Sequence, residues 1–249
     1  ITNSAGAITS SPALLSLSPV AVWGTNDSLA RTLPATATNL LALAVGDTHA
    51  LALRADGTVI GWGGNSCGQA TIPADATNVV RIAAAALRSL ALRDDGTALA
   101  WGQTTAGLNS VPAGLSNVVE IAAGTLHNLA LRGDGTVVAW GMDWSGNPLT
   151  PPVTATNVIA IAAGGSHSLA LRADGTVVGW GNNAMGQVNI PGSATNLIAI
   201  AAGFNFSAGL RADGQVVVWG VLAASPRLTA TWPPRGVTLV AFESRLSIA

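Results

Sequence analysis

The chain has 249 residues, of which 9% are charged, and its net charge is −1. This balance excludes the basic surface that binds nucleic acid or an anionic membrane, and no run of about eighteen apolar residues could form a transmembrane helix. The single cysteine, Cys67, excludes a disulfide within the chain. Ile1 is not an initiator methionine, so we expect a mature or excised part of a longer protein.

The first seventeen residues, "ITNSAGAITSSPALLSL", differ in character from the rest of the chain. They resemble the last two strands of bacterial immunoglobulin-like domains, in which "NSAG" forms a turn and "SSPALLSL" ends the sandwich. A plain linker is the alternative. We therefore predict a linker or domain remnant over 1–17 and a separate domain over 18–249.

Residues 18–249 repeat with an even period. The Trp–Gly pairs are separated by 39, 39, 39, 40 and 39 residues and begin at Trp23, Trp62, Trp101, Trp140, Trp180 and Trp219. The same gaps separate the Asp–Gly pairs and the asparagines that open each unit. A period near 40 that persists over five units indicates one supersecondary unit repeated along the chain.

Each unit predicts three strands, with a weak fourth before its proline. In one unit, "NVVEIAAG" (117–124) is typical of a short buried strand, and "HNLALRG" (127–133) alternates as a half-buried strand does. Asp134 and Gly135 then predict a tight hairpin, because glycine adopts the positive φ that such a turn needs. The strand "TVVAWG" (136–141) follows.

Short strands at this spacing predict an all-β fold, a β-propeller. The Ala- and Gly-rich first strand should lie nearest the axis, and each Trp should fill the gap between neighbouring blades. We expect six blades of about 39 residues, the last closed by two C-terminal strands, with Val240 in the place of Ile121, and by the N-terminal strand "PVAVWG" (19–24). Seven blades are the alternative, if residues 7–18 form a degenerate blade.

The unit "VxxIAAGxxHSLALRxDGTVVxWGxNxxGQxxxP" resembles the regulator of chromosome condensation repeat, and its short blades resemble the bacterial propeller-type β-lactamase inhibitors. The resemblance covers residues 19–249, and both groups are seven-bladed, so six blades would be a departure. It implies nucleotide exchange and chromatin binding through charged loops, which this chain lacks. It also implies enzyme inhibition through aromatic residues before the histidine position, where only Phe204 is aromatic here.

No residue pattern predicts catalysis, a metal or a cofactor. His49, His127 and His167 share one repeat position, so blade geometry should hold them apart, and we expect each imidazole to be hydrogen-bonded at the start of the second strand. Cys67 has no nearby histidine in sequence that could serve as a base. The two glutamates, Glu120 and Glu243, occupy unlike positions. We therefore expect no enzyme.

Residues that break the repeat are the candidate binding residues, because loops carry function on a regular scaffold. They are Met142, Asp143, Trp144, Phe204, Asn205, Trp232 and Arg235. The alternative for the tryptophans is local packing, as in "WPP" (232–234). The sequence thus predicts a noncatalytic module of a secreted bacterial multidomain protein, located extracellularly or on the cell surface. Its expected partner is a protein or a cell-surface glycan, so a lectin-like propeller and an enzyme inhibitor are the alternatives.

Overall fold

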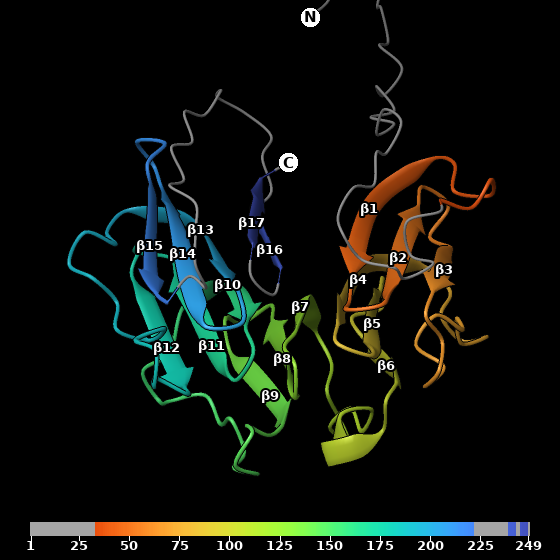
Figure 1. Cartoon of the computed structure of the whole chain (residues 1–249), viewed down its shortest axis with the longest axis horizontal. Coiled ribbons are helices and arrows are strands. Elements are labelled where there is room, and N and C mark those ends of the chain that lie inside the picture. Colours follow the sequence, from red (N-terminus) through yellow and green to blue (C-terminus); the bar gives the residue numbers. More distant parts are fainter. Residues whose placement is uncertain (1–32, 222–238, 243–244, 249) are drawn as a thin grey trace, which may run out of the picture.

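The computed structural model describes residues 33–221, 239–242 and 245–248. These residues form five three-stranded antiparallel sheets and one two-stranded sheet, which follow one another around an arc (Figure 1). The architecture is all-β and consistent with the predicted β-propeller. No helix in the described part of the chain is long and apolar enough to cross a bilayer.

Each of the five larger sheets is a blade with an inner, a middle and an outer strand in chain order. The strands are β1 (Leu40–Val45), β2 (His49–Arg54) and β3 (Val59–Gly63) in blade 1; β4 (Val79–Ala85), β5 (Arg88–Arg93) and β6 (Ala98–Gly102) in blade 2; β7 (Val118–Ala123), β8 (His127–Arg132) and β9 (Val137–Gly141) in blade 3; β10 (Val158–Ala163), β11 (His167–Arg172) and β12 (Val177–Gly181) in blade 4; and β13 (Leu197–Ala202), β14 (Phe206–Arg211) and β15 (Val216–Gly220) in blade 5. The last sheet pairs β16 (Leu239–Phe242) with β17 (Arg245–Ile248). A short 3₁₀ turn, η2 (Thr105–Gly107), follows blade 2.

The inner strands of successive blades lie side by side, from β1 through β4, β7, β10 and β13 to β16. In blades 2 to 5 the inner strand ends in alanine or runs from alanine into glycine, as in Ala122–Gly124, whereas β1 ends in Leu43, Ala44 and Val45. Small side chains allow the inner strands to approach one another, as the sequence predicts. No fourth strand accompanies any of the five blades among the described residues.

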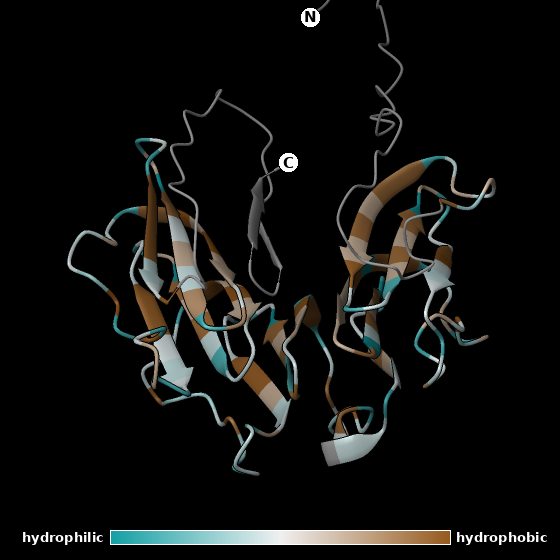
Figure 2. Ribbon diagram, in the orientation of Figure 1, coloured by the Kyte–Doolittle hydropathy of each residue, from teal (hydrophilic) through white to brown (hydrophobic). Residues whose placement is uncertain are grey.

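The core lies at the junctions between blades. At the junction of blades 1 and 2, Trp101 packs with Leu51 and Val79 in one buried cluster, and Figure 2 shows hydrophobic residues concentrated on the strands. The five described tryptophans at this repeat position are all 6–9% exposed. The prediction that tryptophan fills the gap between blades is therefore confirmed at the four junctions between described blades.

The predicted hairpin turns are built as the Asp–Gly pairs indicate. In blade 1, Gly57 has φ +77°, and the Asp56 carboxylate accepts hydrogen bonds from the Thr58 backbone N–H (3.0 Å) and hydroxyl (2.6 Å). These two bonds hold the pKa of Asp56 below its ordinary value. The same turn recurs in blades 2, 3 and 4.

The backbone conformation explains why each unit opens with asparagine. All five adopt the left-handed region, with φ of 52–56°: Asn39, Asn78, Asn117, Asn157 and Asn196. Asparagine tolerates this region better than other non-glycine residues. The carbonyl of each accepts an N–H from the hairpin turn of its own blade, for example from Ala55 to Asn39 at 2.9 Å.

The expectation of a buried first strand is wrong at the second residue of the strand in every described blade. In blade 3, Val118 is 4% exposed but Val119 is 43% exposed. The pairing register with β8 shifts by one residue between Val118 and Glu120. This β-bulge turns the Val119 side chain out of the junction and into solvent.

The C-terminal prediction is confirmed in part. The tail supplies two antiparallel strands, and β16 lies beside β13 as a further inner strand would. The register differs from the expected one: Val240 pairs with Ser247, whereas alignment on blade 3 would pair it with Ala249. Only two residues separate β16 from β17, against three between β7 and β8, so the strands pair closer to their connection. The expected closing strand, residues 19–24, lies outside the described residues.

Candidate binding site

The two ends of every blade are chemically different. The Asp–Gly hairpins lie at one end, which we call the turn edge, and the inner-to-middle connections lie at the other, the loop edge. At the loop edge the residue after each outer strand donates its N–H to the residue before the middle strand: Gly64 to Thr48, Gln103 to Leu87, Met142 to Leu126, Asn182 to Ser166 and Val221 to Asn205. Both loops of each blade therefore lie side by side at this edge.

Two of the predicted binding residues meet at the loop edge. The ring centroids of Trp144 and Phe204 lie 6.3 Å apart, with 52° between the ring planes. Trp144 comes from the connection between blades 3 and 4 and Phe204 from blade 5. Phe204 lies against Gly165 of blade 4, where an added Cβ would meet the Phe204 carbonyl oxygen at 2.7 Å and its ring at 3.1 Å. A side chain at residue 165 would therefore displace Phe204.

The loop that carries Trp144 is fixed from within. The Asp143 carboxylate accepts the backbone N–H groups of Ser145 and Asn147, both at 2.8 Å, and the Asn147 side-chain amide at 3.2 Å. The Asn147 N–H is the main reason that the pKa of Asp143 lies below its ordinary value. Met142 forms a β-bridge with Pro148 at the base of the loop. Asp143 thus holds the loop that presents Trp144, which is 60% exposed.

Two exposed apolar residues that the sequence analysis did not select lie on neighbouring connections of the same loop edge. Val221, 48% exposed, donates its N–H to the Asn205 carbonyl at 3.0 Å, next to Phe204. Met185, 46% exposed, precedes Gly186, where an added Cβ would lie 4.0 Å from Gly220. We call Trp144, Phe204, Met185 and Val221 the loop-edge patch.

The remaining predicted residues divide into two groups. Met142 and Asn205 belong to the framework of the patch through their backbone hydrogen bonds. Trp232 and Arg235 lie outside the described residues. Met185 occupies the repeat position of Cys67. The Cys67 N–H donates to the buried Gln69 side chain at 2.9 Å, and the Met185 N–H donates to the buried Gln187 side chain at 2.8 Å. That shared register was the available signal for an outward-facing side chain.

The three histidines bond across the blade junctions, as the prediction of a structural role requires. Nε2 of each lies 2.9 Å from a serine hydroxyl of the following blade: His49 with Ser89, His127 with Ser168 and His167 with Ser207. The Ser89 hydroxyl donates to the Gln69 carbonyl at 2.8 Å, which also accepts the Trp101 indole N–H at 3.0 Å. His49 therefore donates from Nε2 to the serine oxygen.

Burial keeps these imidazoles neutral. It lowers the pKa of His49 and His167 to about 4 and that of His127 to about 3. A histidine beside a serine can activate a nucleophile, but all six side chains are 0% exposed, so no substrate reaches them. In the described parts of the chain, no three His, Cys, Asp or Glu residues lie close enough together to hold a metal ion.

At the junction of blades 2 and 3, different residues form the hydrogen bonds between the blades. Arg88, 1% exposed, takes the histidine position and donates to the Asn128 side-chain oxygen at 2.6 Å and to the Thr125 carbonyl at 2.9 Å. Burial lowers the pKa of Arg88 to about 10, and the nearby charge of Asp47 opposes that shift. The guanidinium therefore stays protonated at neutral pH.

The even period, the Asp–Gly turns and the inter-blade tryptophans agree with one known repeat. The family model of the regulator of chromosome condensation (RCC1) repeat matches residues 41–69, 118–146, 158–187 and 197–221. The chain carries RCC1 repeats. The matched ranges fall on blades 1, 3, 4 and 5 and leave out blade 2, which contains Arg88. No curated protein matches the sequence.

Solved RCC1-type and propeller structures share this fold. The entire ectodomain of the Physcomitrella patens receptor kinase CR4 is 26% identical, with a TM-score of 0.64, over 80% of this chain and 55% of that one. Human WBSCR16 is 22% identical, with a TM-score of 0.61, over 73% and 61%. Prp20p of Saccharomyces cerevisiae is 20% identical, with a TM-score of 0.50, over 75% and 73%. This chain thus spans less than two thirds of the first two proteins.

Proposed function

We propose that the chain is a noncatalytic binding module that holds a protein partner at its loop edge. The loop-edge patch carries this proposal, because Trp144 is 60% exposed beside a second aromatic ring. Exposed apolar residues that gather in one place mark interaction surfaces. Tryptophan in particular is enriched among the residues that dominate binding energy.

The patch is also prepared for binding before any partner arrives. Asp143 closes the Trp144 loop with three hydrogen bonds, and Gly165 leaves the space that Phe204 fills. A side chain that is already held loses less conformational entropy when it is buried in an interface. Rigid aromatic anchors of this kind favour a protein surface with a complementary pocket.

The comparisons support a protein as the partner. RCC1-type propeller repeats typically mediate protein binding, and Prp20p binds Gsp1p and histones. We propose further that the chain is an extracellular or cell-surface part of a secreted bacterial multidomain protein; the similarity to a receptor-kinase ectodomain supports the extracellular location alone. Fractionation of the source cells, followed by immunodetection, tests that location.

The experiment uses the full chain, immobilised, to capture proteins from the surface and secreted fraction of the source organism. Mass spectrometry identifies the captured protein, which is then purified and titrated against the chain by calorimetry. Trp144→Ala should weaken binding by about 30-fold, the effect of losing about 2 kcal/mol at a hot spot. Val153→Thr is the matched control, because Val153 is 94% exposed and lies outside the patch. Unchanged affinity in Trp144→Ala and Phe204→Ala, or turnover of an ester or glycan library, contradicts the proposal.

A carbohydrate ligand is the second candidate, and the exposed indole of Trp144 favours it, because an aromatic face can pack against the apolar face of a sugar ring. A glycan array probed with the full chain distinguishes the two. Binding of one glycan class that Trp144→Ala abolishes would establish the lectin-like function, provided that no protein is captured in the first experiment.

We propose, in addition, that the ring has six blades. Leu43 and Val45 of β1 are each 37% exposed, whereas Ile161 and Ile200, at the position of Leu43, are 5% and 9% exposed against the preceding blade. In blades 4 and 5 the preceding blade covers this apolar face, and blade 1 presents the same face more exposed. Deletion of 239–249 should lower the melting temperature by about 10 °C, the effect of losing several kcal/mol in a domain of this size. Deletion of 1–17 should leave it unchanged in a six-bladed ring and lower it in a seven-bladed one.

A further inference from the structure

The turn edge carries exposed aliphatic side chains at one repeat position. The bulge described for Val119 recurs in all five inner strands, where the register shifts between the first and third residues. The bulged residue is aliphatic in every blade: Leu41 (51% exposed), Val80 (50%), Val119 (43%), Ile159 (54%) and Ile198 (59%). We call these five residues the aliphatic ring. The residue before each of them is at most 4% exposed.

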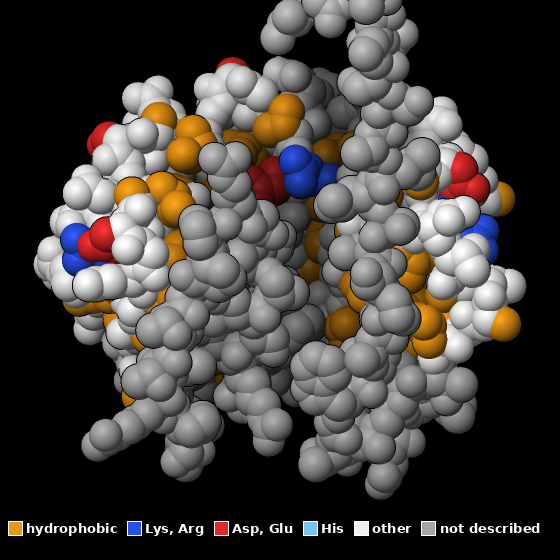
Figure 3. Space-filling model, turned by 90° about the horizontal axis from the view of Figure 1, so that it is seen from above, with side chains coloured by type: hydrophobic (Ala, Val, Ile, Leu, Met, Phe, Trp, Pro, Cys, Tyr) orange, Lys and Arg blue, Asp and Glu red, His pale blue; other side chains and the backbone are white. Residues whose placement is uncertain are grey.

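Backbone contacts place the aliphatic ring beside the hairpin turns. The first residue of an inner strand donates its N–H to the turn glycine of the preceding blade, as Val79 does to Gly57 at 3.0 Å and Leu197 to Gly175 at 3.1 Å. Figure 3, which looks onto this edge from above, shows hydrophobic side chains interspersed with charged ones, of which one acidic and one basic side chain lie near the middle of the view and the others lie toward its periphery. Exposed apolar side chains bordered by charged ones are typical of a protein interface.

The aliphatic character does not follow from the geometry of the strand. The next residue of the strand varies freely and is Ala42, Arg81, Glu120, Ala160 or Ala199 in the five blades. Polar residues are therefore accepted one position away. Threonine would serve an exposed position on a strand equally well, since it shares the β-branched preference of valine and isoleucine. Five exposed aliphatic residues in register thus point to a contact that buries them.

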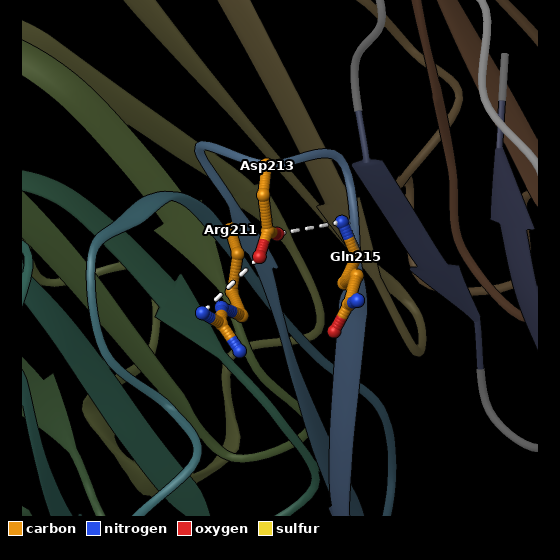
Figure 4. A network of polar contacts seen from close by, with 3 residues as sticks. All are labelled: Arg211, Asp213 and Gln215. Atoms are coloured by element: carbon orange, nitrogen blue, oxygen red, sulfur yellow. Dashed lines mark hydrogen bonds and ion pairs between the residues drawn. The ribbon is translucent and has the colours of Figure 1, made fainter.

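The hairpin turns have charges of both signs in every blade. Each hairpin has an arginine two residues before an aspartate, and blade 2 adds a second aspartate, Asp94. In blade 5 Arg211 lies 3.1 Å from Asp213, whose other oxygen accepts the Gln215 N–H at 3.0 Å (Figure 4). The corresponding pairs are Arg54 with Asp56, Arg93 with Asp95, Arg132 with Asp134 and Arg172 with Asp174. In these four turns one carboxylate oxygen accepts the bonds from threonine, and the other has no hydrogen bond from the described residues.

We infer that the aliphatic ring is the contact surface for a second copy of this chain, turn edge against turn edge. An edge that repeats arginine and aspartate offers no net attraction to a strongly charged partner or an anionic membrane. It complements a surface with the same repetition, because each arginine of one copy can face an aspartate of the other. Two-fold contacts require such self-complementarity, and the two aliphatic rings then bury each other.

Sedimentation velocity of the full chain between 2 and 200 µM tests this inference. The wild type should shift from monomer to dimer over this range. Ile159→Glu combined with Ile198→Glu should raise the dimer dissociation constant at least tenfold, because each copy would bring two carboxylates into the contact between the aliphatic rings. Ser66→Glu with Thr104→Glu adds the same charge at exposed loop-edge positions and should leave the dissociation constant unchanged.

Circular dichroism and melting temperature check that each variant is folded. If the glutamate variant fails to fold, Ile159→Thr with Ile198→Thr replaces it, since threonine keeps the branched shape and removes apolar area. A monomer at every concentration overturns the inference. So does a dimer that the loop-edge control weakens as much as the ring variant. The result is independent of the proposed partner at the loop edge.

Discussion

Replacing His167 with phenylalanine should make the stability of the propeller less sensitive to acid. The unfolded imidazole takes up its proton near pH 6.5, whereas burial lowers the pKa of folded His167 to about 4. Between these values protons favour the unfolded chain, so the wild type loses stability as the pH falls from about 6.5 to 4. At about 1.4 kcal/mol per pH unit, this residue alone costs the wild type about 2–3 kcal/mol by pH 4.5.

Phenylalanine should fit because blade 5 already has it at this position. Phe206 is 1% exposed and its ring lies against Gly203, as the His167 ring lies against Gly164. The variant loses the 2.9 Å hydrogen bond to Ser207, but the Ser207 hydroxyl keeps its bond to the Gln187 carbonyl. The cost at pH 7.5 should therefore be about 0.5–1.5 kcal/mol. The order of stability should reverse by pH 4.5.

Urea unfolding followed by tryptophan fluorescence at pH 7.5, 6.0, 5.0 and 4.5 measures both proteins. The quantity to compare is the difference between variant and wild type, because the contributions of all other titrating groups cancel in it. Phe206→His is the reverse control and should make the stability more sensitive to acid. A difference that stays constant from pH 7.5 to 4.5 would refute the argument that burial holds His167 neutral.

Three further changes test separate parts of the fold. Gly164→Ala should lower the free energy of unfolding by about 1–3 kcal/mol in urea titrations, because its Cβ would clash with the His167 ring and with the Gly203 carbonyl. Gly192→Ala is the control and should be close to neutral, because its Cβ would have no atom within 4 Å. Burial raises the pKa of Glu120 from 4.5 to about 7, so the wild type loses stability as the pH rises from about 4.5 through 7. The Glu120→Gln side chain does not titrate, so in urea titrations the free energy of unfolding of this variant should exceed that of the wild type by about 1–2 kcal/mol at pH 8 and should lose that advantage below pH 4.5. Asn117→Ala should cost about 1–2 kcal/mol at its φ of 56°, and Asn117→Gly should cost less; equal stability of the two would show that the left-handed backbone is not the reason for asparagine.

Features that repeat within one unit could be predicted from the sequence. Asp134 and Gly135 form the expected turn, Trp140 lies in the expected junction, and His127 has the expected hydrogen bond. The asparagines were recognised as periodic, but their left-handed φ became clear only from the backbone. Local chemistry determines these features, so a single unit contains the information for them.

Features that depend on two units were harder to predict. Trp144 and Phe204 were each selected as breaks in the repeat, but their contact joins segments sixty residues apart. The Arg88–Asn128 bond left a signal that could have been read, because both residues depart from the repeat in successive blades. Met185 left a signal in the register that it shares with Cys67, but Val221 left none, since the exposure of an apolar residue depends on which loops surround it.

The bonds across the junctions limit how blades of this protein could be exchanged. Ser89 accepts a hydrogen bond from the histidine of the preceding blade, whereas Asn128 accepts one from an arginine, so the two junctions use different pairs of residues. A blade moved to a new place in the ring would keep its own half of each pair and meet the wrong half next to it. Shuffling or duplicating units therefore succeeds most easily when the segment that is transferred begins and ends inside blades and carries a complete junction between them.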